Sequence, residues 1–325
     1  MGPVRPGDTK GAMILCFTIA TLFVALWVYR HGWVMYNDSA TYLLISAGHP
    51  ASGPFRWRLL IPWILRPWVR KSGPPPYRPK TPAHVHKWVA RPPMFIWSAL
   101  SWACMITTAV LLSSQTVTPW MACILFCAIP WYRILAAGPF MTDQLGMLCA
   151  VAVTLLPLEF AIPVAIIGGL AHERSPVFAA AYAWNPIFLV GCIPPLLIAL
   201  FKRTGRGPCL PWEMGWVDKW FSGTRSYHNG CPLWYLIAPW GAMLLGAEPD
   251  IQLGLVVALA YGQMVVACDR ERLFQWAAPA LLAPAVAVLS GCSNIVITLV
   301  LTAHIFSPFM DPVSAGKKVW GDSDG

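Results

Sequence analysis

Apolar runs long enough to cross a lipid bilayer recur along this chain, and they constrain its fold more than any other feature. The run from Ala12 to Tyr29 contains no charged residue, and neither does the run 93–113. A membrane-spanning helix needs about 17 to 25 such residues. Of the 325 residues, 57% are hydrophobic and 11% are charged, whereas soluble domains carry about 25% charged residues. The sequence therefore predicts an all-α fold, a polytopic bundle of transmembrane helices.

The other apolar segments are shorter or contain proline, which indicates kinked or half-crossing helices. We predict about nine to eleven segments within a single integral-membrane domain that covers residues 1–325. Besides the first run and a short return segment, 55–68, they lie at 93–113, 118–137, 144–158, 160–171, 176–201, 231–246, 251–268, 273–290 and 293–309.

Basic residues gather in two polar segments and predict the topology. Seven Lys and Arg residues lie in 66–92 and five lie in 202–229, in a chain of net charge +9. By the positive-inside rule, both segments and the N-terminus are cytoplasmic, and residues 30–58 form an exoplasmic loop. We expect a multi-pass protein of the plasma membrane. Because apolar spans separate the basic segments, they predict contact with anionic lipid and no nucleic-acid partner.

The exoplasmic loop holds the first candidate site. Asp38 begins a predicted short amphipathic helix that lies along the membrane surface, with Tyr42 and Leu43 on its apolar side, and Arg56 and Arg58 follow. Carboxylates at membrane depth are costly and usually face a bundle interior or a wet cavity. The alternative is that Asp38 only caps the short helix while the arginines extend to lipid headgroups.

Two later polar groups are also candidates. Asp143 follows a Gly-Pro break and begins a helix, where a carboxylate complements the helix dipole or acts in a site. His172, Glu173 and Arg174 interrupt an apolar region. Glu173 and Arg174 could form a structural ion pair at a helix seam, or Glu173 could align a substrate or pair with an arginine of a phosphate site.

These motifs together resemble the GT-C superfamily of integral-membrane glycosyltransferases. The resemblance comprises Asp38 in the first exoplasmic loop, Tyr42 four positions later, a proline-containing return segment, Thr142-Asp143 at a helix start, and Asp269-Arg270-Glu271-Arg272 before Pro279. It implies transfer of a sugar from a polyprenyl-phosphate donor to an exoplasmic acceptor. The alternative for residues 269–272 is a short polar connection between two helices.

The chemistry of such a transfer needs these residue types. A carboxylate takes the proton of the acceptor hydroxyl, and cations stabilise the departing phosphate. Asp38 is the predicted base, with Asp143 and Glu173 as further catalytic candidates. Arg56 and Arg58, and after them Arg270 and Arg272, are the predicted phosphate ligands because the guanidinium fork bonds two oxygens. Tyr42, His172, Arg174 and Asp269 complete the predicted substrate-binding set.

No metal site is predicted, because separated single carboxylates do not define one. Under the enzymatic interpretation, Asp143 could share a divalent Mg or Mn ion with Asp38. Two other functions fit the same residues. A transporter or lipid-linked-oligosaccharide flippase would use the buried charges for binding alone, and a non-catalytic membrane subunit would use them to contact partners.

Overall fold

The computed structural model describes residues 6–31, 42–43, 45–48, 58–69, 91–138, 142–201, 240–248, 250–263 and 275–306. These parts of the chain consist of helices joined by turns and include no β-strand. The all-α prediction is therefore confirmed for the described residues.

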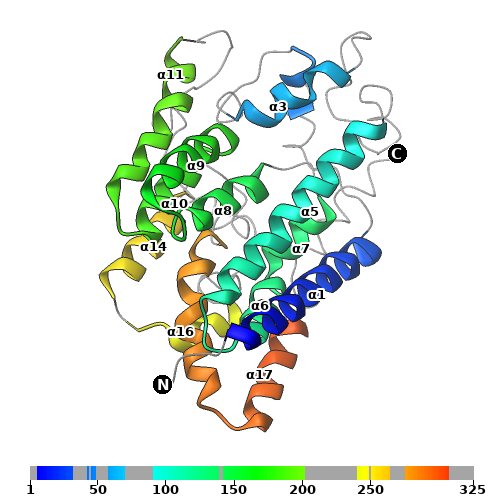
Figure 1. The fold of residues 1–325 in the computed structure, drawn as a ribbon, viewed down its shortest axis with the longest axis vertical. Helices are drawn as coiled ribbons and strands as arrows, with labels where there is room; N and C mark the ends of the chain where they lie inside the picture. Colours follow the sequence, from blue (N-terminus) through cyan, green and yellow to red (C-terminus); the bar gives the residue numbers. More distant parts are fainter. Residues whose placement is uncertain are drawn as a thin grey trace, which may run out of the picture.

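Within each described range, short connections join consecutive helices (Figure 1). The helices are α1 (Pro6–His31), α3 (Leu60–Leu65), η2 (Arg66–Trp68), α5 (Arg91–Ser114), α6 (Pro119–Cys127), α7 (Pro130–Ala137), α8 (Asp143–Ala152), α9 (Leu158–Ala171), α10 (Ser175–Tyr182), η3 (Pro186–Cys192), α11 (Ile193–Phe201), η5 (Gly241–Gly246), α14 (Ile251–Gly262), η7 (Gln275–Ala277), α16 (Ala278–Ser290) and α17 (Asn294–Phe306).

Two helices are long and apolar enough to cross a membrane. They are Lys10–Arg30 of α1, with 21 residues, and Phe95–Ser114 of α5, with 20 residues. At a rise of about 1.5 Å per residue, each matches a hydrocarbon core of about 30 Å. The pair α6 and α7 would make a third span, although it is bent by 67°. The bend occurs at Pro130, which has no N–H to donate, and the preceding Ile129 is extended.

The remaining predicted segments form shorter helices. Segment 176–201 is divided among α10, η3 and α11. The segments 144–158, 160–171, 251–268, 273–290 and 293–309 correspond to α8, α9, α14, α16 and α17, with ends that differ by a few residues. Among the described residues, two helices, or three with the bent pair, have the length of a span. Proline and glycine divide several of the apolar runs, so hydropathy alone overestimates the length of helices such as α8, α10 and α14.

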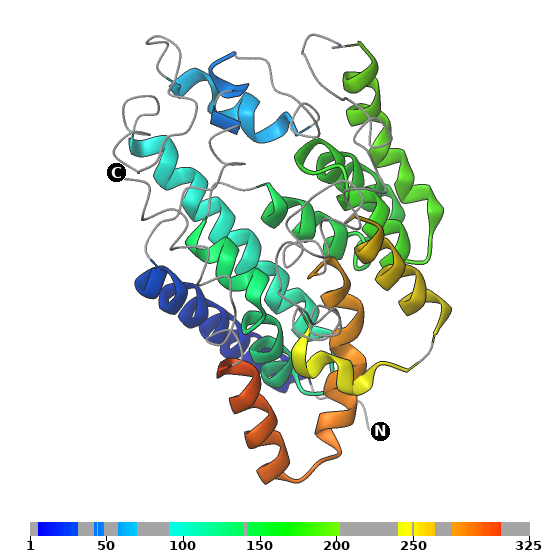
Figure 2. The ribbon, with the colours of Figure 1, turned by 180° about the vertical axis from the view of Figure 1, so that it is seen from behind.

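The path between α1 and α5 differs from the predicted one. The two helices lie side by side and run in opposite directions (Figures 1 and 2), so His31 and Arg91 lie at the same end of the pair. The described part of the predicted return segment contains α3, whose six residues extend over about 9 Å. This helix is too short to cross the bilayer. If α1 and α5 both span, Pro6 and Arg91 lie on opposite sides of the membrane, whereas the predicted topology places the N-terminus and the segment 66–92 on the same side.

The core forms where α1 packs against α5, α6 and α7. Cys16, Ala20, Val24 and Trp27 of α1 are buried at helical spacing. On the other side of α1, side chains such as Ile14, Phe17 and Leu22 are exposed, as a lipid-facing surface requires. Cys123 and Cys127 are buried in α6 with their sulfur atoms 3.9 Å apart. They pack as small residues of the hydrophobic core.

A second, smaller apolar cluster covers one end of the fold. Tyr42 and Leu43 pack with Ile61 and Leu65 of α3 and with Trp97 of α5. Tyr42 and Leu43 are helical and buried, as predicted for the apolar side of the short amphipathic stretch. This cluster brings Tyr42 and Arg58 next to the turn between α9 and α10.

Candidate functional site

Six residues from separate parts of the sequence meet around the turn between α9 and α10. They are Tyr42, Arg58, Asp143, His172, Glu173 and Arg174, and we call them the charged cluster. All six belong to the predicted catalytic or substrate-binding set. Except for Glu173, whose side chain is 17% exposed, each residue is buried. The cluster therefore concentrates charge in a part of the protein from which water is largely excluded.

The strongest interaction in the cluster is the ion pair between Arg58 and Glu173. Nε of Arg58 donates to Oε2 of Glu173 at 2.6 Å, and Nη2 donates to Oε1 at 2.6 Å. This bidentate geometry is the strong form of an Arg–carboxylate contact. The two residues are 115 positions apart in the sequence. The pair therefore ties the segment before α3 to the α9–α10 turn.

Tyr42 links this ion pair to the start of α8. Its hydroxyl accepts a hydrogen bond from Nη1 of Arg58 at 2.6 Å and lies 3.1 Å from Oγ1 of Thr142. Thr142 is the residue before α8, and Asp143 is in the first turn of that helix. The hydroxyl groups thus connect the guanidinium of Arg58 to the end of α8 that carries Asp143.

His172 lies between the two carboxylates. Its Nε2 is 3.5 Å from Oδ1 of Asp143, and its Nδ1 is 3.7 Å from Oε2 of Glu173. Nδ1 also accepts the backbone N–H of Arg174 at 3.3 Å. Since an accepting ring nitrogen carries no proton, the neutral imidazole holds its proton on Nε2, facing Asp143. His172 can therefore orient the Asp143 carboxylate.

Small residues make the space for this arrangement. A Cβ atom at Gly146 in α8 would lie 2.7 Å from Cβ of His172, too close for any larger residue. Oγ of Ser175 donates to the carbonyl oxygen of Gly146 at 2.7 Å. Glycine at this position in α8 therefore lets the α9–α10 turn approach Asp143.

The ionisation states follow from burial and from the neighbouring charges. Burial raises the pKa of Glu173, but attraction to Arg58 outweighs it and holds the pKa well below its usual range. Burial, reinforced by the charge of Arg58, lowers the pKa of His172 to about 4 against the opposing carboxylates. At neutral pH, Glu173 is ionised and His172 is neutral. Both residues lie in the turn, outside the two helices that are long and apolar enough to span a membrane.

The neutral state of His172 makes stability dependent on pH. As the pH falls from about 6.5 to about 4, the unfolded chain binds a proton that the folded protein does not bind. The contribution of His172 to the free energy of unfolding is therefore fully present above about pH 6.5. We expect the free energy of unfolding to fall by about 3 kcal/mol by pH 4. Melting curves in detergent between pH 7 and pH 4 measure this loss.

The matched variant for the pH experiment is His172→Gln, which stays neutral throughout. His304 is also buried, so the difference between the two proteins isolates His172. An equal loss of stability in wild type and variant would show that His172 does not cause the pH dependence.

Five predicted site residues lie outside the described residues. They are Asp38, Arg56, Asp269, Arg270 and Arg272. Conversely, the sequence analysis did not include Trp276, whose ring centroid is 5.3 Å from that of His172. The preceding Gln275, also buried, is a polar residue inside the apolar run 273–290. A buried amide in such a run is itself a signal of an internal site.

No metal-ligand set is present in the described part of the chain. There, no group of three or more His, Cys, Asp or Glu side chains could hold a metal ion. Asp143 and Glu173 are directed at His172 and Arg58, respectively. Asp38, the other residue of the divalent site considered from the sequence, lies outside the described residues, so the shared ion stays a prediction.

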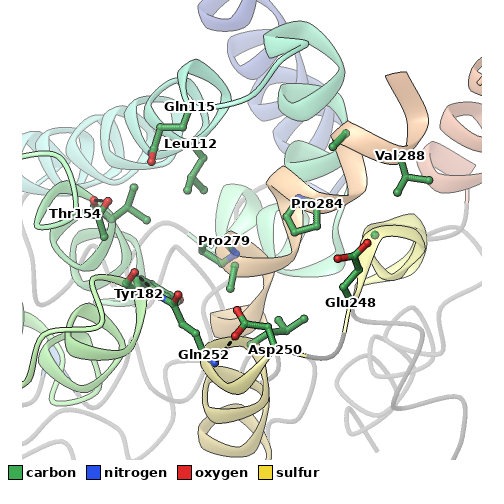
Figure 3. A pocket seen from close by; sticks show the side chains of 15 residues that line it. Leu112, Gln115, Thr154, Tyr182, Glu248, Asp250, Gln252, Pro279, Pro284 and Val288 are labelled. Carbon is green, nitrogen blue, oxygen red and sulfur yellow. Dashed lines mark hydrogen bonds between the residues drawn. The ribbon is translucent and has the colours of Figure 1, made fainter. Parts of the chain in front are cut away.

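A separate cavity of about 480 Å³ lies at the other end of α8 (Figure 3). Its polar lining includes Thr154, Tyr182, Glu248, Asp250 and Gln252, and its described lining residues include two carboxylates but no Lys or Arg. Tyr182 donates a hydrogen bond to the carbonyl oxygen of Trp276, which connects the cavity wall to the charged cluster. Because its charges are acidic, the cavity does not fit a phosphate group.

Comparison with known proteins does not identify a relative. No protein-family model, curated protein or solved structure matches this chain.

Proposed function

We propose that this protein is a membrane glycosyltransferase of the GT-C type that transfers a sugar from a polyprenyl-phosphate donor. The observation that carries the proposal is the convergence of the charged cluster. Residues selected from three separate parts of the sequence for one reaction lie around one turn. Buried cations beside carboxylates suit a reaction in which a phosphate leaves and a hydroxyl loses its proton.

Arg58 and Arg174 take the role of phosphate ligands in this proposal. Both side chains are buried, and both guanidinium groups lie near Glu173, whose Oε1 is 3.9 Å from Nε of Arg174. Glu173 orients Arg58. Its strongly depressed pKa makes it a weak proton acceptor. We therefore assign Glu173 a positioning role.

Asp38 and Asp143 are the proposed groups for proton transfer. Asp38 lies outside the described residues and remains the base predicted from the sequence. Asp143 is described, and the N–H of the neutral His172 imidazole faces it. In the proposed step, the acceptor hydroxyl oxygen attacks the anomeric carbon as the bond from that carbon to the phosphate oxygen breaks. The phosphate leaves with the bonding electrons, and the hydroxyl proton passes to the carboxylate.

The direct test is a transfer assay with purified protein in liposomes. The substrates are polyprenyl phosphates that carry a radiolabelled sugar, together with a panel of hydroxyl acceptors. Formation of a labelled product and release of polyprenyl phosphate would support the proposal. If the lipid instead moves between leaflets with its sugar still attached, the protein is a flippase, the second function predicted from the sequence.

The proposal also requires an orientation. With a cytoplasmic N-terminus in the plasma membrane, α1 runs outward, so His31, α3 and the start of α5 lie on the exoplasmic side. We expect Cys at position 66 to react with a membrane-impermeant thiol reagent in intact cells. Cys at position 115, just after the other end of α5, should stay unlabelled. The experiment uses a variant without the 10 native cysteines.

The reverse labelling pattern would place the charged cluster on the cytoplasmic side and contradict an exoplasmic acceptor. It is also the pattern that the positive-inside rule predicts from the basic segment 66–92 alone. The labelling therefore decides whether the charged cluster lies on the exoplasmic side, as the proposed reaction requires, or on the cytoplasmic side, as the basic residues of 66–92 predict.

A further inference from the structure

Gln275 and Trp276 form a wall of the charged cluster that the proposed mechanism does not yet use. They begin η7, and both side chains are completely buried. The indole of Trp276 packs against the imidazole of His172, with the ring centroids 5.3 Å apart, and against Phe178 at 5.1 Å. The indole also reaches α8, since its Cη2 would lie 3.4 Å from a Cβ atom at Gly146. The turn is thus in contact with the centre of the cluster.

Three polar atoms of this turn have no hydrogen-bond partner among the described residues. They are Nε1 of Trp276 and both Nε2 and Oε1 of Gln275. Each buried polar atom without a partner costs about 1–3 kcal/mol, and native proteins satisfy about 90% or more of such atoms. Three of them in two successive residues indicate that a ligand or water completes the turn.

The chemistry of the three atoms limits the ligand. An indole N–H donates one hydrogen bond, and a carboxamide both donates and accepts, but none of these groups carries a charge. They fit the hydroxyl groups of a neutral sugar better than a phosphate or a carboxylate. Arg58 and Arg174 supply the positive charge that a phosphate needs.

We propose that Gln275 and Trp276 bind hydroxyl groups of a neutral, uncharged sugar beside His172. This inference rests on the proposed function and adds the class of sugar that the donor carries. The phosphate then lies toward Arg58 and Arg174, and the sugar lies toward η7. A uronic acid or an amino sugar would bring a charge to a turn that has no charged side chain of its own.

Trp131 provides a matched control. It is also completely buried, and its Nε1 also has no partner among the described residues. Its ring packs against Phe126 in the hydrophobic core, 5.9 Å between centroids. An unpaired indole N–H therefore does not by itself mark a ligand site. The contact with His172 distinguishes Trp276.

The experiment compares two probes in lipid nanodiscs: a polyprenyl phosphate, and the same lipid phosphate linked to a neutral hexose. Benzothienylalanine at position 276 replaces the indole N–H by sulfur and keeps the ring. The same replacement at position 131 is the control. One neutral hydrogen bond contributes about 1 kcal/mol, so we expect the variant at 276 to bind the hexose lipid about 3- to 10-fold more weakly. Binding of the bare lipid phosphate, and of both probes to the variant at 131, should not change.

Each other outcome has a definite meaning. If wild type binds neither probe, the proposed function fails, and this inference fails with it. If wild type binds both probes but the variant at 276 binds the hexose lipid normally, the turn holds only water and the inference alone is wrong. An equal weakening for both probes, or at both positions, would indicate a general effect on the fold and would also overturn the inference.

Discussion

Replacement of Glu173 by Gln is expected to destabilise the protein by about 3–5 kcal/mol, because it leaves a buried guanidinium without its counter-charge. Arg58 is 1% exposed and places two of its three nitrogen atoms on the Glu173 carboxylate. Arg58→Met should cost less. The reason is that the Glu173 carboxylate, which is 17% exposed, would still have a positive charge nearby, since Nε of Arg174 lies 3.9 Å from its Oε1.

Unfolding in detergent measures these losses, and a double-mutant cycle separates the pair from its surroundings. The double variant Arg58→Met with Glu173→Gln should lose less stability than the two single variants together, because it removes both charges. Arg66→Ala is the control, since Arg66 is exposed and directly follows α3. We expect it to change stability by no more than about 0.5 kcal/mol. If Glu173→Gln also changes the free energy of unfolding by no more than about 0.5 kcal/mol, the ion pair does not stabilise the fold.

Replacement of Asp38 or Asp143 by Asn is expected to lower the rate of sugar transfer about 10²- to 10⁴-fold, the usual contribution of a positioned general base. Asn keeps the size of the side chain but does not accept a proton. Asp143 is completely buried and faces His172. The measurement is the turnover number with saturating lipid-linked sugar, alongside a melting curve that verifies folding.

The control for these variants is Glu159→Gln. Glu159 is an exposed carboxylate in the first turn of α9 and is not part of the charged cluster. Its replacement should leave turnover within a factor of about two, as expected for a surface change of small energy. If the Asp38 variant is folded and retains full activity, Asp38 is not the base. If the Asp143 variant alone loses activity, Asp143 takes that role.

Much of the helical architecture could be predicted from local features of the chain. The run from Ala12 to Tyr29 lies within α1, and 93–113 corresponds to α5. Backbone polar groups in an apolar environment must be paired within the segment, so an uninterrupted apolar run of this length forms a helix. Pro130 interrupts another run, and the bend between α6 and α7 occurs there.

The path of the chain after α1 could not be predicted in the same way. Hydropathy describes Phe55–Trp68 as an apolar return segment, but it does not distinguish a crossing from a short helix packed on the protein. Ile61 and Leu65 of α3 are buried against Tyr42 and Trp97. Tertiary packing therefore accounts for apolar residues of the segment that the sequence analysis described as a return across the membrane.

The sequence by itself determined which residues are candidates, because a charged residue in an apolar run is costly unless it has a partner or a function. Only the tertiary structure decided which of them interact. Arg58 and Glu173 are 115 positions apart, and the strength of their attraction depends on the distance between two atoms. That distance is set by how α3, α8 and α9 pack, which no local pattern specifies. The same packing makes Glu173 the ionised partner of Arg58 and directs His172 toward Asp143.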